Sequence, residues 1–299
     1  MASETLWTVL LSTLLGVTSM ELIAFIVLAY VRRAGQLVTI FALFAFAAGI
    51  SAVCCAIAYS VKETKNYSLL WAYIGLTSET IVLVYIALFQ FLILFQQRVH
   101  GQSWTALWPG SHIGVSLLGN NYQLSSKVSW IFNWAIAAVN TLMATGASTL
   151  PGASYTLIDS IRRKQHLSRS LLLASYALMI CLALIIVLIF LSEWSNVVRI
   201  GVDSQYMTIL LICEGIIILQ CITSIMALTI PTFDIASISV LTAPMTTGIA
   251  LWQFIAVWGC LVVEYGQFVY LLWIWNNYEE YEDNKIPADP TTLHEEVSM

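Results

Sequence analysis

The chain has 299 residues, of which 59% are hydrophobic and only 10% are charged, and its mean hydropathy is +0.83. Because soluble domains have about one-quarter charged residues, this composition excludes an ordinary soluble protein and indicates an integral membrane protein. The net charge of −5 arises largely in the last 21 residues, and there is no cationic patch of the kind that binds nucleic acid.

Seven apolar stretches are long enough to cross a bilayer, which takes about 20 residues of helix. We therefore expect an all-α bundle of seven transmembrane helices, at about residues 6–31, 36–60, 67–96, 128–150, 170–192, 205–230 and 247–275. The first stretch is too long for a cleaved signal peptide and lacks a basic start, so we expect it to be the first span. Residues 1–275 then form one transmembrane domain, and the acidic residues 276–299 are predicted to be a disordered tail.

The first two spans are predicted to be antiparallel neighbours, because only a very short loop after Arg32 separates them. The second span carries a row of small residues at helical spacing, Ala45, Gly49, Ala52 and Ala56. Such a row lets the backbone of another membrane helix approach closely. It therefore predicts a packing face.

The third span carries Glu79 near its middle. At helical spacing, Glu79 shares a small and polar stripe with Ala72, Gly75, Gln90 and Gln97. A charged group at the centre of a bilayer costs about 2.5–3.5 kcal/mol. We therefore expect the stripe to face other helices or a wet cavity, and Glu79 to be functional.

The fourth span also has a small and polar stripe, formed by Asn133, Ala137, Asn140, Ala144 and Ser148. Asn133 and Asn140 are natural hydrogen-bond partners for the glutamates, and equally plausible as polar packing residues. The basic stretch before the fifth span, residues 153–169, predicts an interfacial helix against anionic lipid. The fifth span is almost uniformly apolar, so we expect it to face lipid on most sides.

Four glutamates lie near the middle of spans, Glu21, Glu79, Glu214 and Glu264, and no Lys or Arg lies near the middle of any span. Loss of water disfavours a charged carboxylate. Each glutamate is therefore a neutral hydrogen-bond donor, an ion in a wet cavity, or a ligand for a cation. Glu264 shares a stripe with Gln253, Cys260 and Gln267, whereas Glu21 and Glu214 have poor polar stripes and are secondary candidates.

Several membrane-protein classes lack their required residues in this chain. A retinal protein needs a lysine in its last span, and none occurs between Leu241 and Asn277. A rhodopsin-like receptor has an acidic-Arg-aromatic triplet where this third span ends with residues 95–99, Phe-Gln-Gln-Arg-Val. No Cys-x-x-Cys or His-x-x-x-His pattern suggests a metal site, so we expect neither a metal nor a cofactor.

The architecture, with Glu79 in the third span and Glu264 in the last, resembles the small seven-span terpene cyclases of fungal secondary metabolism. The resemblance implies metal-free protonation of a lipophilic, epoxidised prenylated substrate, whose carbocation is stabilised by aromatic rings. Glu79 would be the proton donor and Glu264 its partner. The substrate-binding residues would be Gln90, Asn133, Asn140, Gln253, Trp258 and Tyr265.

Other functions remain open. The glutamates would also suit a proton- or cation-coupled carrier, and a divergent seven-span receptor or a structural membrane subunit fits the same composition. Six basic residues fall on each side of the membrane, so the positive-inside rule does not decide the orientation. We expect a multi-pass protein of the endoplasmic reticulum or another endomembrane, with the bilayer and a lipophilic small molecule as its partners.

Overall fold

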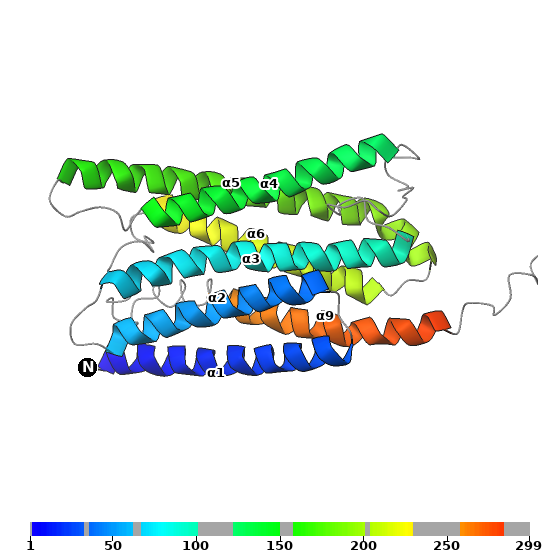
Figure 1. The fold of residues 1–299 in the computed structure, drawn as a ribbon, viewed down its shortest axis with the longest axis horizontal. Helices are drawn as coiled ribbons and strands as arrows, with labels where there is room; N and C mark the ends of the chain where they lie inside the picture. The colour runs from blue at the N-terminus through cyan, green and yellow to red at the C-terminus, as the bar shows by residue number, and fades with distance from the viewer. Residues whose placement is uncertain are drawn as a thin grey trace, which may run out of the picture.

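The computed structural model describes residues 2–32, 36–61, 67–100, 122–149, 158–200, 204–229 and 258–283. Within these ranges the chain forms seven helices: α1 (Ala2–Val31), α2 (Gln36–Val61), α3 (Tyr67–His100), α4 (Tyr122–Thr149), α5 (Ile158–Ile200), α6 (Ser204–Thr229) and α9 (Cys260–Asp283). Successive helices run in opposite directions along the long axis of the molecule (Figure 1). The all-α prediction is confirmed, and so is the antiparallel arrangement of the first two helices.

Five of the described helices are long and apolar enough to cross a membrane: α1, α2, α3, α5 and α6. The apolar part of α9, Cys260–Ile274, is shorter, and residues 247–257 of the predicted last span lie outside the described residues. The helix α4 is not among the five, because its asparagines, serines and threonines lower its hydropathy. These helices indicate a membrane-embedded protein.

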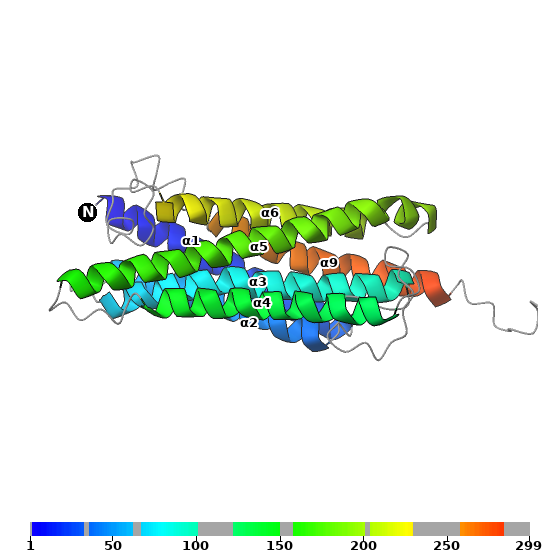
Figure 2. The same ribbon diagram turned by 90° about the horizontal axis from the view of Figure 1, so that it is seen from above.

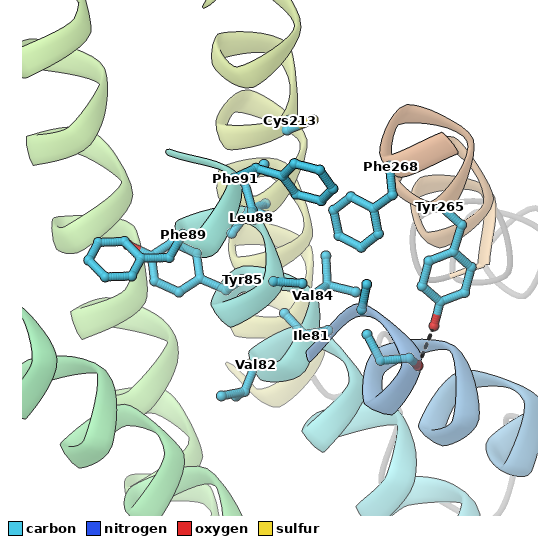
Figure 3. Packing of buried hydrophobic residues seen from close by; sticks show 14 of the residues in the cluster. Ile81, Val82, Val84, Tyr85, Leu88, Phe89, Phe91, Cys213, Tyr265 and Phe268 are labelled. Carbon is cyan, nitrogen blue, oxygen red and sulfur yellow. Dashed lines mark hydrogen bonds between the residues drawn. The ribbon is translucent and has the colours of Figure 1, made fainter. Parts of the chain in front are cut away.

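Helix α3 lies at the centre of the bundle, where it contacts α2, α4 and α6. Its aromatic side chains pack on α4 and on α9. The ring of Phe91 packs on Phe268 of α9 with centroids 5.5 Å apart (Figure 3). The ring of Phe89 faces Phe132 of α4, with centroids 6.2 Å apart. At the far end, Phe95 stacks on Tyr206 of α6. An aromatic pair adds about 0.5–1.5 kcal/mol beyond the area that it buries, so these rings fix the position of α3.

The row of small residues on α2 is a packing face, as predicted. Ala45, Ala52 and Ala56 have no exposed surface, and Gly49 is buried. Tyr265 of α9 lies over this row, and its hydroxyl donates a hydrogen bond of 2.6 Å to the carbonyl oxygen of Ala45 (Figure 3). Its ring stacks on Phe46. A Cβ atom at Gly49 would collide with the Tyr265 hydroxyl. The contact between α2 and α9 therefore requires glycine at this position.

The expectation that the fifth span faces lipid on most sides agrees with its burial, since less than half of its apolar stretch is buried, and the buried positions form one face. Helix α5 packs against both α4 and α6, and a regular face of it is buried, including Leu172, Met179, Ala183 and Ile186. Because lipid tails are as apolar as leucine, hydrophobicity does not distinguish a buried face from a lipid-facing one. The basic stretch is not a separate interfacial helix, since α5 is continuous from Ile158.

Replacing Gly49 by alanine should destabilise the protein by about 1–3 kcal/mol, because the new methyl group overpacks the Tyr265 contact. Gly16→Ala is the matched control, because a Cβ atom there meets nothing within 4 Å. Thermal unfolding of the purified protein in detergent measures both changes. The cost of Gly49→Ala should fall in a Tyr265→Phe background, since the nearest clashing atom is then absent. An equal cost in both backgrounds would contradict the packing described.

Candidate functional site

Two glutamates from different helices lie together in the interior. Glu214 of α6 and Glu264 of α9 are each 1% exposed, and their carboxyl groups are close enough to interact electrostatically. No Lys or Arg occurs in α6 or α9. The two carboxyl groups therefore share an apolar environment without a basic partner on either helix.

Helical periodicity explains why the two side chains meet. The buried positions of α6 follow one another at intervals of three and one residues, Leu210, Cys213, Glu214, Ile217, Gln220, Cys221 and Ser224. On α9 the buried positions are Leu261, Glu264, Tyr265, Phe268, Leu271 and Leu272. Each set forms a single face of its helix, and α6 and α9 are in contact. Each glutamate thus belongs to the face that its helix buries.

Polar side chains link α6 to α9 on either side of the carboxyl pair. The amide of Gln220 donates to Oε2 of Glu264 at 3.4 Å. About two turns earlier on α6, the thiol of Cys213 donates to Oε1 of Gln267 at 2.6 Å. We call these four residues together with Glu214 the α6–α9 polar line. It runs along an interface that is otherwise apolar.

The polar line is incompletely satisfied within the chain. Oε2 of Glu214, Oε1 of Glu264 and Oε1 of Gln220 are buried without a hydrogen-bond partner in the part of the chain that the structure describes. A buried polar group without a partner costs about 1–3 kcal/mol. Natural proteins have few such groups, and they concentrate at sites where function requires them. The α6–α9 polar line is therefore the strongest candidate site among the described residues.

Aromatic side chains adjoin this site. Tyr85 of α3 lies close enough to Glu214 to interact electrostatically, and its hydroxyl is also buried without a partner. Tyr265 follows Glu264 directly, and Phe268, one turn later, packs on Phe91 (Figure 3). The electron-rich faces of such rings attract positive charge.

The other two glutamates occupy different places. Glu21 of α1 is half-buried and reaches across to α9, where its Oε1 lies 3.4 Å from the position of a Cβ atom on Gly266. Glu79 of α3 is half-buried and lies near Tyr176 of α5. The structure thus pairs Glu264 with Glu214, a secondary candidate from the sequence. The role of Glu79 as a proton donor stays a prediction.

Two of the predicted partners of Glu79, Gln90 and Asn140, are not beside it. Gln90 is half-buried on α3, but eleven residues of helix separate it from Glu79, which amounts to about 16 Å. Asn140 is exposed on the outer side of α4, so the prediction that it orients a glutamate was wrong. Asn133 is half-buried on α4. The stripe of Glu79 faces inward only in part: Ala72 is exposed and Gly75 has free space beside it, whereas Oε1 of Glu79 is buried and has no hydrogen-bond partner among the described residues.

The remaining predicted residues belong to α9 and the segment before it. Trp258 is buried against Tyr73 of α3, with ring centroids 6.0 Å apart. Tyr265 is fully buried, and its hydroxyl is engaged by the backbone of α2. Gln253 lies outside the described residues. Tyr265 thus holds α9 in place next to Glu264.

Sequence reasoning missed Gln220, which donates to Glu264. The sequence did contain a signal for it. Gln220 and Glu214 both belong to the buried face of α6, whose positions recur at spacings of three residues and one residue. The two residues are six positions apart and therefore point about 120° away from each other around the helix axis, at opposite edges of the buried face. Considering a single stripe of α6 therefore underestimated the number of polar side chains near Glu214.

No group of three or more His, Cys, Asp or Glu side chains in the described helices could hold a metal ion. Comparison of the chain with protein-family models, with curated proteins and with solved structures finds no match. No related protein therefore suggests a role for the residues of the α6–α9 polar line.

The pairing of Glu214 with Glu264 predicts that their substitutions are energetically coupled. Glu214→Gln and Glu264→Gln should be non-additive by about 0.5–3 kcal/mol in the free energy of unfolding, because each change alters the partner of the other carboxyl group. Glu79→Gln combined with Glu264→Gln is the matched control and should be additive within about 0.5 kcal/mol. Unfolding of the full chain in mixed detergent micelles gives these values. Additivity for Glu214 and Glu264 would refute the pair.

Proposed function

We propose that this protein is a membrane-embedded, metal-independent terpene cyclase that protonates a lipophilic, epoxidised prenylated substrate. Glu264 is the proton donor and Glu214 its partner. The observation that carries this proposal is the pair of carboxyl groups, each 1% exposed and without a basic residue on its helix. Two adjacent carboxyl groups in an apolar interior cannot both ionise at low cost, so the pair retains a proton.

The reaction requires an acid that still holds its proton near neutral pH. The proton of Glu264 would be transferred to the epoxide oxygen while a carbon–oxygen bond breaks. The resulting carbocation would be attacked by an alkene of the same substrate, and loss of a proton to the carboxylate would end the cyclisation. The product has the mass of the substrate, and the acid is regenerated. Tyr85 and Phe268 supply aromatic faces for the cationic stages.

We further propose that all seven described helices cross the membrane. Helix α4 packs between α3 and α5, both of which are apolar enough to span a bilayer. The short apolar part of α9 would reach full length with residues 247–257, which are apolar in sequence. A substrate of this class partitions into lipid and would enter between helices, and we propose an endomembrane such as the endoplasmic reticulum as the location of the protein.

One observation favours a second candidate, a proton-coupled carrier. The α6–α9 polar line extends over Cys213 to Gln220 on α6 and therefore covers about 10 Å along the helix axis. Coupled carriers bind and release protons on carboxyl groups inside the bundle, linked to further polar side chains. The same glutamates would then carry the coupling proton.

Product analysis by mass spectrometry tests the cyclase. Membranes that contain the wild type, Glu264→Gln, Glu214→Gln or Glu79→Gln would be supplied with a panel of epoxidised prenylated substrates. We expect the wild type to form an isomer of unchanged mass. The rate of Glu264→Gln should be lower by at least about 100-fold, as expected when a general acid is removed. Glu79→Gln should retain activity.

Two outcomes would contradict the proposal. If only Glu79→Gln abolishes the product, the acid is Glu79 and the carboxyl pair is structural. If the wild type converts no substrate, but vesicles show pH-driven uptake that Glu264→Gln abolishes, the carrier is correct.

A further inference from the structure

A second group of buried polar side chains lies where α3, α5 and α6 meet. Tyr176 of α5 is 5% exposed, and its hydroxyl lies within hydrogen-bonding reach of Ser78 of α3 and Ser224 of α6. Both serines are buried. In the view from above, α5 runs obliquely between α6 and α3, which lets one side chain reach both helices (Figure 2). Tyr176 therefore joins polar groups of three helices.

This group connects to the α6–α9 polar line along α6. Ser224 follows Cys221 by three positions and Gln220 by four, so these side chains are neighbours on one face of the helix. The thiol of Cys221 has no exposed surface. It lies close enough to Tyr176 and to Glu264 to interact electrostatically with both. Cys221 therefore links Tyr176 to the carboxyl pair.

On the side of α3, the same group reaches Glu79. Tyr176 lies near Glu79, whose Oε1 is buried and has no hydrogen-bond partner among the described residues. Glu79 is half-buried, whereas Tyr176, Cys221 and the carboxyl pair are buried. On the stripe of Glu79, a Cβ atom at Gly75 would meet nothing within 4 Å, and Ala72 is exposed. Glu79 is therefore the point at which these connected groups come closest to the surroundings of the protein.

The chemistry of the linking side chains suits the movement of protons. A hydroxyl and a thiol each carry one hydrogen that they donate and lone pairs that accept another, although a thiol does both more weakly. Tyr176 and Cys221 can therefore accept a proton from one neighbour and pass their own to the next. Carboxyl groups, which take up and release protons, lie at both ends of the connection. Polar groups that served only to pack helices together would not require such ends.

We propose that Glu79, Tyr176 and Cys221 form a proton path through which the carboxyl pair of Glu214 and Glu264 exchanges protons with the surroundings. A proton that enters at Glu79 passes to the oxygen of Tyr176, the hydroxyl hydrogen of Tyr176 passes to the sulfur of Cys221, and the thiol hydrogen passes to the pair. The reverse sequence releases a proton, and after either passage Tyr176 and Cys221 again hold one hydrogen each. The proton path rests on the proposed function in one respect, since it requires a pair that holds a proton.

The rate of proton exchange, rather than enzymatic activity, is the quantity that reports on this path. Cyclisation returns the proton to the carboxyl group at the end of each turnover, so a blocked path leaves the rate of product formation unchanged. Replacement of the proton by deuterium from heavy water, in contrast, requires passage between the pair and the surroundings. Loss of the path therefore slows this replacement without removing the acid.

Infrared spectra of the full-length protein in bilayers, recorded over time after ordinary water is replaced by heavy water, test the proton path. The carbonyl band of the protonated pair, identified as the band that Glu264→Gln removes, shifts on deuteration. Tyr176→Phe and Glu79→Gln should each slow this shift by at least about tenfold, as expected when a positioned proton-transfer group is lost. Tyr206→Phe is the matched control, because it removes another buried tyrosine hydroxyl, close to the beginning of α6. It should exchange at the wild-type rate.

Substitutions of Cys221 separate proton transfer from packing, and they serve if Tyr176→Phe does not fold. Cys221→Ala should slow the exchange, whereas Cys221→Ser, which keeps a group that donates and accepts, should exchange at the wild-type rate. Equal slowing by both would overturn the proton path, and so would unchanged exchange in Tyr176→Phe and Glu79→Gln or equal slowing by Tyr206→Phe. A wild type without the band would overturn the cyclase together with the path, whereas a band that exchanges equally fast in all variants would overturn the path alone.

Discussion

A carboxyl group inside a bundle of apolar helices must find a counter-ion, keep its proton or stay wet, and this constraint governs the interior of the protein. Glu214 and Glu264 are each 1% exposed and lie close enough to interact electrostatically, and neither of their helices offers a basic residue. Our proposal is that the pair holds a proton, and the Gln220 amide, which donates to Glu264, would steady it. Two unpaired carboxyl oxygens are retained at a cost of about 1–3 kcal/mol each, which a purely structural helix contact would avoid.

The surrounding packing keeps this pair in position. Tyr265, which follows Glu264, is held between the small residues of α2 and the ring of Phe46, and its hydroxyl bonds to the backbone of Ala45. Phe268 is held by Phe91 on the central helix α3. Helix α9 is thus fixed from two sides, which leaves Glu264 directed at α6. Rigid placement of this kind is what an acid needs in order to protonate one atom of a substrate.

The sequence predicted the helices well because their signal, long apolar stretches, does not depend on neighbours. The small row on α2 was also correctly predicted as a packing face, since Ala and Gly at helical spacing have few other uses in a membrane. The side of each helix that faces the protein interior was harder to predict from the sequence. The polar stripe of α4 turned outward, and the sequence did not locate the buried face of α5, because apolar side chains suit both lipid and a protein interior. Glu264 was identified, but its proximity to Glu214 depends on how α6 meets α9, which no local pattern specifies.

Infrared spectroscopy of the protein in bilayers at neutral pH, in ordinary and in heavy water, would examine the carboxyl pair most directly. A protonated carboxylic acid has a carbonyl band separate from that of an ionised carboxylate. The wild type should show this band, and Glu264→Gln and Glu214→Gln should each diminish or remove it while Glu79→Gln leaves it unchanged. A wild-type spectrum without the band, or a band that only Glu79→Gln removes, would show that the pair holds no proton.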